Sequence, residues 1–431
     1  MLAKKLKYGA FLVAVALLSS CSKKDLPQGT RLAVLPIEKA EGKEVMAGEN
    51  KISLPTAQKN SAWTQSGGNS EHSYGNLHGH YPLKKLWQKK FGASAGRRDL
   101  LISEPVVAEN MLFTLDAKAE VSAFNLEDGT LLWTAKTLDN KGKKTASSFK
   151  GAGLAANASN VFVTTGLGEV VALDLKTGSS VWKHDASTPL RTAPAVASGK
   201  VYVQTIDNRL IAINARTGEE VWNYEILQED TTFLGGASPA ISSGQDLMVA
   251  AFSNGELQAF KASTGSILWN NMLVANRYSS TLSSINAVRA DPVIVDDVVY
   301  AVGNSKTLAA IDSLSGERLW AKPLSGAYQP IVSGKYLFVL SSDNFLSAME
   351  KENGTLVWSR KLPLEDVALR PLLMEGYLLI ATIEGKVFKV DAKTGEVIET
   401  FDIGKRLSVS PISVDGKLIF STTSAEILVY E

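Results

Sequence analysis

A short phrase recurs seven times along this 431-residue chain, and it constrains the fold more than any other feature. Each copy has an alternating apolar stretch and a turn with Asp, Asn, Thr or Ser before Gly, as in AFNLEDGTLLW and ALDLKTGSSVW. The turn glycines are Gly129, Gly178, Gly218, Gly265, Gly316, Gly354 and Gly395. A repeat of roughly 40–50 residues with period-2 alternation and glycine turns is typical of a β-propeller, in which each repeat forms one blade.

Six copies place a Trp four residues after the turn Gly, and we interpret this position as structural. A Trp that covers the gap between two blades buries on the order of 200 Å² of surface. In the seventh copy the position is taken by Glu399. Six copies also have an Ala six residues before the Gly, which favours close approach of neighbouring sheets. The indoles are those of Trp133, Trp182, Trp222, Trp269, Trp320 and Trp358.

A proline before an apolar stretch gives the number of blades independently. Proline is tolerated at the first residue of a strand because its missing N–H breaks no ladder bond. The prolines are Pro105, Pro194, Pro239, Pro292, Pro330, Pro371 and Pro411. The second repeat has Leu154 in this place, which makes eight strand starts but only seven glycine turns. The outer strand missing at the C-terminus is expected around Leu86 and Trp87, 46 residues before Trp133.

We therefore predict an all-β fold. It is an eight-bladed β-propeller of four-stranded antiparallel blades, with the last blade closed by the N-terminal strand, because a closed ring leaves no ragged edge. The predicted domains are a lipoprotein signal peptide at residues 1–20, a lipidated flexible tether and N-terminal loop at 21–82, and the propeller at 83–431.

The first residues have the features of a processing signal. A basic start is followed by an apolar stretch too short to span a bilayer and by small residues before the single cysteine, Cys21. Leu-Ser-Ser-Cys resembles the bacterial lipobox, which implies that Cys21 carries acyl chains such as palmitate that anchor the chain in a membrane. Because Ser22 rather than Asp follows, the sorting pattern implies the periplasmic face of the outer membrane. The alternative is an ordinary secretory signal with an idle thiol.

The region before the first blade contains a possible metal-binding set. His72, His78 and His80 lie close to Glu71 in sequence and could in principle ligate a metal. The surrounding segment, residues 61–80, is rich in Gly and polar residues, so we predict a surface loop and no metal site. The formal net charge of +1 argues against a nucleic-acid surface.

The repeat resembles the PQQ-dehydrogenase propeller repeat, A-x-D-x-x-T-G-x-x-x-W, over roughly residues 85–431. Enzymes of that family carry vicinal cysteines, Ca²⁺ ligands and a catalytic Asp on long insertions. This chain has one cysteine and short blades. The resemblance therefore implies the fold without the chemistry, and we predict no quinone cofactor, no catalytic residue and no enzyme activity.

The lipobox, the tether and the PQQ-like propeller together resemble the BamB family of outer-membrane lipoproteins. That resemblance implies a scaffold of the β-barrel assembly (BAM) complex that binds the periplasmic POTRA domains of BamA, beside other subunits of the complex. The family carries a Leu-Arg pair that contacts BamA in the loop between the Trp and the Pro of two successive repeats. Leu190 and Arg191 occupy it here, with Thr188 at an earlier position that is apolar in the family. The alternative is that Leu190 packs beneath its own blade and that Arg191 is solvated.

In a four-stranded blade with strands a (innermost) to d (outermost), the d–a and b–c loops emerge at one end of the ring and the glycine turns at the other. The longer predicted d–a segments are 134–153, 183–193, 223–238 and 270–291, and variable length marks that end as the interaction face. Two alternatives stay open at this point, namely a residual quinoprotein dehydrogenase and a propeller that binds an envelope polymer.

Overall fold

The structure is a computed structural model. It describes residues 44–46, 52–97, 99–138, 151–190, 192–225, 237–252, 254–273, 290–303, 307–324, 326 and 328–431. All of these lie in one compact unit, Ala40–Glu431. None of the described residues belongs to a helix long and apolar enough to cross a membrane.

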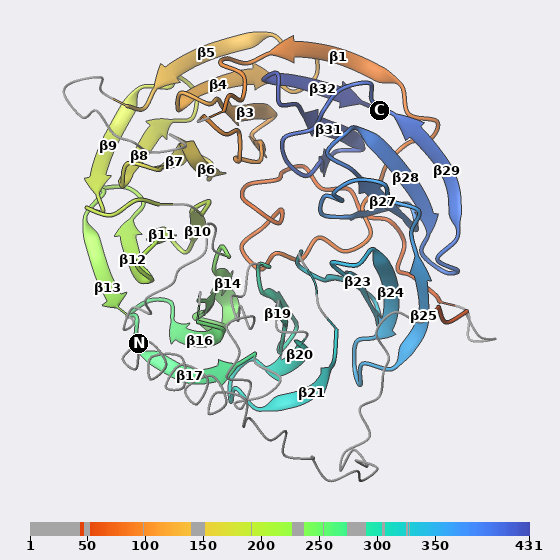
Figure 1. The fold of residues 1–431 in the computed structure, drawn as a ribbon. Coiled ribbons are helices and arrows are strands. Elements are labelled where there is room, and N and C mark those ends of the chain that lie inside the picture. The colour runs from red at the N-terminus through yellow and green to blue at the C-terminus, as the bar shows by residue number, and fades with distance from the viewer. Residues whose placement is uncertain are drawn as a thin grey trace, which may run out of the picture. The chain divides into compact units, whose positions relative to one another are not determined.

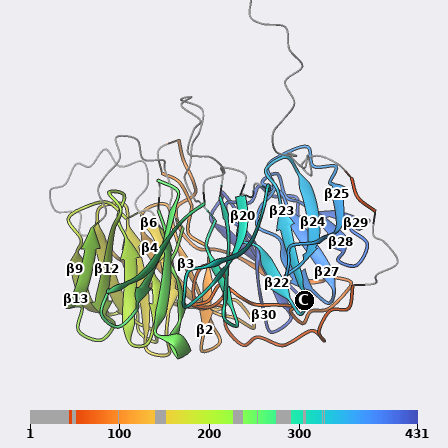
Figure 2. The same cartoon turned by 90° about the horizontal axis from the view of Figure 1, so that it is seen from below.

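Eight four-stranded antiparallel sheets form the blades of a β-propeller, which we number I to VIII (Figure 1). The predicted fold class is therefore confirmed. Seven prolines stand directly before the innermost strand of their blades, as predicted, and Leu154 lies inside the innermost strand of blade II. Figure 2 shows the sheets from the side of the ring.

The strands follow one another in chain order from the innermost to the outermost position of each blade. Blade I consists of β2 (Val106–Ala108), β3 (Met111–Leu115), β4 (Glu120–Asn125) and β5 (Leu131–Lys136). Blade II consists of β6 (Gly151–Ala156), β7 (Asn160–Thr165), β8 (Glu169–Asp174) and β9 (Ser180–Asp185). Blade III consists of β10 (Ala195–Ala197), β11 (Lys200–Gln204), β12 (Arg209–Asn214) and β13 (Glu220–Glu225). Blade IV consists of β14 (Ala240–Ser242), β15 (Leu247–Ala251), β16 (Glu256–Lys261) and β17 (Ile267–Met272), with the 3-10 turn η1 (Ser243–Gln245) after β14.

The second half of the ring repeats this order until the last blade. Blade V consists of β18 (Val293–Val295), β19 (Val298–Gly303), β20 (Thr307–Asp312) and β21 (Arg318–Lys322). Blade VI consists of β22 (Ile331–Ser333), β23 (Tyr336–Leu340), β24 (Phe345–Glu350) and β25 (Leu356–Lys361). Blade VII consists of β26 (Leu372–Met374), β27 (Tyr377–Ala381), β28 (Lys386–Asp391) and β29 (Val397–Asp402). Blade VIII consists of β30 (Ile412–Val414), β31 (Lys417–Ser421), β32 (Glu426–Tyr430) and β1 (Lys85–Lys90).

Closure of the ring uses the N-terminal strand, as predicted. β1 pairs antiparallel with β32, with Trp87 opposite Val429 and Lys90 opposite Glu426. The C-terminal strand thereby gains a partner from the other end of the chain. This pairing completes blade VIII and protects an edge that would otherwise be open.

The hydrophobic cores lie between successive blades, and the repeat tryptophans join them. Each indole N–H donates a hydrogen bond to a backbone carbonyl beside the glycine turn of the next blade, as Trp358 does to Ala392 O at 3.1 Å. The turn glycine has positive φ and lies against the indole, so that a Cβ on Gly395 would come within 2.7 Å of Trp358 Cε3. Across the strand pair the six tryptophans of the repeat stand opposite its small Ala, as Trp358 does opposite Ala348, whereas Trp87 stands opposite Val429. Seven tryptophans make this bond: Trp87, Trp133, Trp182, Trp222, Trp269, Trp320 and Trp358.

The eighth junction, between blades VII and VIII, is built differently. Here the Ala–Trp pair is replaced by Lys389 opposite Glu399. The Lys389 ammonium lies 3.5 Å from the ring centroid of Tyr81 and 4.3 Å from that of Tyr377. Tyr81 belongs to the chain that leads into β1, so the N-terminal region supplies the contact that a tryptophan makes at the other junctions.

Residues 52–80, which we call the central segment, fill the middle of the ring (Figure 1). Ile52, Trp63 and Leu77 are 1–2% exposed. The contacts of residues 60–79 follow the order of the blades through one full circuit. They join Asn60 to blade VIII, Trp63 to blade I, Thr64 to blade II, Gln65 to blade III, Ser70 to blade IV, Glu71 to blade V, His72 to blade VI, Tyr74 to blade VII and Gly79 to blade VIII.

The central segment caps the free edges of the innermost strands. Its carbonyls accept hydrogen bonds from backbone N–H groups of these strands, with Val107 donating to Trp63 O at 2.8 Å and Ile294 to Glu71 O at 2.9 Å. Unpaired N–H groups buried at these edges would otherwise be costly. The surface loop predicted for residues 61–80 is therefore wrong, because Trp63, His72 and Leu77 are buried and the backbone of this stretch bonds to the innermost strands. Residues 21–43 of the predicted tether lie outside the described residues.

Candidate functional site

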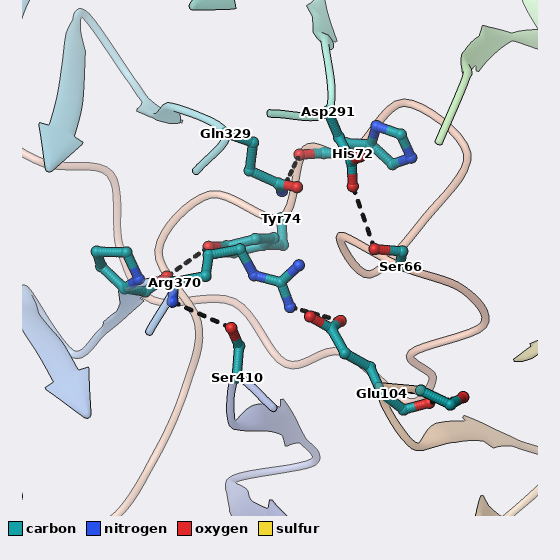
Figure 3. A network of polar contacts seen from close by, with 10 residues as sticks. Ser66, His72, Tyr74, Glu104, Asp291, Gln329, Arg370 and Ser410 are labelled. Carbon is teal, nitrogen blue, oxygen red and sulfur yellow. Dashed lines mark hydrogen bonds and ion pairs between the residues drawn. The ribbon is translucent and has the colours of Figure 1, made fainter. Parts of the chain in front are cut away.

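A buried pair of oppositely charged side chains lies in the central channel (Figure 3). Arg370 Nη2 donates to Glu104 Oε2 at 2.8 Å, and the two side chains are 4% and 18% exposed. The Arg370 backbone N–H donates to Ser410 Oγ at 3.0 Å. These contacts join the segments before blades I, VII and VIII. Burial raises the pKa of the Glu104 carboxyl, although the Arg370 guanidinium beside it acts in the opposite direction.

Aromatic residues of the central segment enclose this ion pair. The Arg370 guanidinium lies 5.6 Å from the ring centroid of Trp63, close enough for a cation–π contact. Tyr74 Oη donates to Pro371 O at 2.9 Å, and burial raises the pKa of this phenol. The central segment therefore shields the ion pair from solvent on one side, and the charges of Arg370 and Glu104 neutralise one another.

His72 is held on the other side of the channel (Figure 3). Its Nδ1 lies 2.8 Å from Pro292 O, and because a carbonyl only accepts, Nδ1 carries the proton. Gln329 Nε2 donates to His72 O at 3.2 Å, and Ser66 Oγ donates to Asp291 Oδ2 at 3.1 Å. Burial lowers the pKa of His72, so the ring is neutral. These bonds fix the central segment to blades V and VI.

The fold separates His78 and His80, which lie together, from His72 and Glu71. His78 Nδ1 lies 2.6 Å from Glu375 Oε1, and the His78 and His80 rings meet edge to face at 5.0 Å. His72 is buried in the channel and Glu71 accepts a bond from Ser242 Oγ at 2.8 Å. In the part of the chain that the structure describes, no group of three or more His, Cys, Asp or Glu side chains is arranged to hold a metal ion.

The predicted partner-binding pair is only half described, since Arg191 and the predicted lipidation site Cys21 lie outside the described residues. Leu190 is buried, which agrees with the alternative interpretation of this residue. Its side chain is 0% exposed, in the core between blades II and III. Its N–H donates to Thr165 O at 3.2 Å, and Thr188 Oγ1 donates to Asp207 Oδ2 at 3.2 Å. The pair's role in binding stays a prediction.

Each of the predicted d–a segments begins inside the outermost strand of its blade. Residues 134–136 lie in β5, 183–185 in β9, 223–225 in β13 and 270–272 in β17, and at the far end of the first segment residues 151–153 lie in β6. The alternating pattern continues into these residues, which is why the sequence set the boundaries too early.

The most consequential feature that sequence reasoning missed is the central segment. One signal for it was present, because the chain has eight tryptophans and only Trp63 lies outside the repeat. A large aromatic residue in a Gly-rich polar stretch indicates local burial. The polar residues around it misled because many of their partners lie far along the chain, such as Val196 for Gln65 and Pro292 for His72.

The geometry defines the chain as a closed propeller whose channel is occupied by its own residues. Its residues 117–360 and 342–431 match the family model described as outer membrane protein assembly factor BamB. The chain belongs to this family. It is 28% identical over 317 residues to the outer membrane protein assembly factor BamB of Salmonella typhimurium, covering 73% of this chain and 80% of that protein.

Two solved structures have a similar fold. The BamB structure from Moraxella catarrhalis has a TM-score of 0.69 and 17% identity, covering 81% of this chain and 99% of that one. A europium-containing methanol dehydrogenase also has a TM-score of 0.69, with 14% identity, covering 86% of this chain and 98% of that one. At these identities both likenesses concern the fold alone.

Proposed function

We propose that the chain is a non-enzymatic scaffold lipoprotein of the outer-membrane β-barrel assembly machinery. It binds the periplasmic POTRA domains of BamA, beside other subunits, and assists assembly and insertion of outer-membrane proteins. The observation that carries this proposal is membership of the BamB family over most of the propeller. The names of its relatives, outer membrane protein assembly factors, support the same role.

The filled channel supports a scaffold rather than a catalyst. Arg370 and Glu104 neutralise one another and are shielded by Trp63, so these charges are not presented to a substrate. A propeller of this kind offers partners its outer surfaces, and the rigid ring keeps loops of successive blades at fixed spacings. Loops on a rigid scaffold are the common location of binding residues.

The anchor belongs to the same proposal. Acyl chains on Cys21 hold the protein on the periplasmic face of the outer membrane, where the machinery works. Several acyl chains give stable attachment, whereas one chain alone is marginal.

For the partner contact we propose the segment between β9 and β10. The buried Leu190 and the bond of Thr188 to Asp207 hold this segment firmly against blades II and III. Leu190 thus acts by positioning the segment, and Arg191 beside it is the residue that contacts BamA. Arg is enriched among interface residues whose truncation weakens binding.

The test measures binding of the purified protein to the POTRA domains of BamA by calorimetry. Arg191→Ala should weaken binding about 30-fold, since truncation of such an anchor costs about 2 kcal/mol. The matched control is Arg216→Ala, an exposed arginine in the glycine turn of blade III at the opposite end of the ring, which should bind normally. Equal binding by both variants refutes the contact, and no binding by the unaltered protein refutes the scaffold role.

A further inference from the structure

The outermost strands of the blades differ in charge, and the one in blade IV has none. β17, with the sequence ILWNNM, contains no charged side chain, and its residues Ile267, Leu268 and Met272 are 50%, 46% and 36% exposed. Charged side chains on an edge strand oppose pairing with another chain. Blade IV therefore lacks a protection that the other blades have. Each of the other outermost strands contains at least one charged residue: KLWQKK, LLWTAK, SVWKHD, EVWNYE, RLWAK, LVWSRK and VIETFD.

Blade VI shows which backbone groups such a strand offers to another chain. Val45 and Ser359 exchange both backbone hydrogen bonds, each with an N–O distance of 2.9 Å. Ser359 stands opposite Ser347 on the inner side. In an antiparallel ladder, a residue that exchanges backbone bonds with one neighbour faces the other neighbour without such bonds. The N–H and C=O at this position therefore point out of the blade, where an added antiparallel strand can bind them.

Asn270 occupies the corresponding position of β17, on the outer rim of blade IV (Figure 1). It stands opposite Gln258 and, like Ser359, lies five residues after the turn glycine of its blade. Leu268 and Met272 have the same orientation because side chains and backbone groups alternate along a strand. The Met272 carbonyl does point outward, since it accepts a hydrogen bond from Arg318 Nη2 at 2.7 Å. Within the described ranges, no bridge occupies Leu268 or Asn270.

We propose that β17 pairs antiparallel with β17 of a second copy of this chain, about a two-fold axis at Asn270. Asn270 then exchanges both backbone bonds with Asn270 of the partner subunit, and Leu268 lies opposite Met272 of the partner subunit. The strand suits this partner because it is apolar at both positions beside Asn270 on the same face. It also brings no charge against its own copy. In β9 the same position is Lys183, and two lysines would face one another.

The pairing leaves the existing contact of Arg318 intact. The Met272 carbonyl stays bound to Arg318, while the Met272 N–H donates to the Leu268 carbonyl of the partner subunit. One strand pair buries less surface than a standard interface of about 1,600 Å². We therefore expect a weak dimer whose formation depends on concentration.

Disulfide formation at the two-fold axis tests the pairing. Residues that exchange both hydrogen bonds have Cα atoms about 5.5 Å apart, which suits a disulfide. The full-length protein with Asn270→Cys should therefore form disulfide-linked dimers when its membranes are mildly oxidised. The matched control is Asn223→Cys, at the same position of β13 and also exposed, and both variants keep Cys21. Asn270→Cys should give about tenfold more dimer than the control. Equal yields, or cross-links to a different protein in place of the dimer, overturn the pairing.

Sedimentation of the purified full-length protein in detergent tests the association without a cross-link. The unaltered protein should pass from monomer to dimer between about 1 and 100 μM. Asn270→Lys places like charges opposite one another and should weaken the dimer about tenfold or more, with an unchanged melting temperature. Asn223→Lys should dimerise as the unaltered protein does. A monomer throughout this range, or an unchanged dimer in Asn270→Lys, overturns the proposal.

Discussion

Replacing Gly395 by Ala tests the contact that joins successive blades. Gly395 has φ +73°, and an added Cβ would lie 2.7 Å from Trp358 Cε3. A left-handed residue other than Gly costs about 1–2 kcal/mol, and overpacking of a core costs about 1–3 kcal/mol. Displacement of Trp358 would also break its bond to Ala392 O, worth about 0.5–1.5 kcal/mol. We therefore expect Gly395→Ala to lower the free energy of unfolding by about 3–6 kcal/mol.

The same blade supplies the control. Gly376 has φ +78°, and an added Cβ would meet no heavy atom within 4 Å. Gly376→Ala should lose only the conformational part, about 1–2 kcal/mol. The assay is urea unfolding followed by tryptophan fluorescence. The free energies of unfolding of the two variants are compared, provided that their m-values are the same. If the two variants lose the same stability, the Trp–Gly contact contributes nothing and the reasoning is refuted.

Three further predictions concern single residues. Burial lowers the pKa of His72, so its contribution to stability is complete above pH 6.5, the pKa of an unburied imidazole, and is lost as the pH falls towards the pKa in the folded protein. His72→Gln should therefore flatten the fall in melting temperature between pH 7.5 and 5.5. An unchanged slope would contradict this. Leu190→Ala should lower stability by about 2–5 kcal/mol in urea unfolding, and full stability would show that Leu190 is not a core residue. Tyr81→Ala should cost about 2–4 kcal/mol by removing the contact with Lys389 at the eighth junction, and a loss below about 0.5 kcal/mol would show that this contact does not hold the ring closed.

The blades were predictable because the residues that define each repeat make their contacts within the same blade or the next one. Gly at the turn, Ala opposite Trp, and Pro before the innermost strand are all set by contacts within about 50 residues. The count of eight strand starts against seven turns also predicted the composite blade with Trp87, because one blade lacked its outermost strand and only the N-terminal strand was left to supply it.

The central segment could not be predicted in the same way. Its partners, such as Val107 and Ile294, are backbone groups presented by a ring that must first be assembled. A segment recognised by backbone needs no periodic apolar pattern, so Gly and polar residues there looked like a surface loop. The burial of Leu190 could be given only as an alternative for a related reason, because a single apolar residue in a polar loop shows no periodicity.

The proposed role is tested most directly by purification of the full-length lipidated protein from detergent-solubilised outer membrane. The account predicts that BamA co-purifies with the unaltered protein, and that Cys21→Ala no longer fractionates with the membrane after a high-salt wash. Recovery of the protein without BamA, under conditions in which other subunits of the machinery stay bound to BamA, would contradict it.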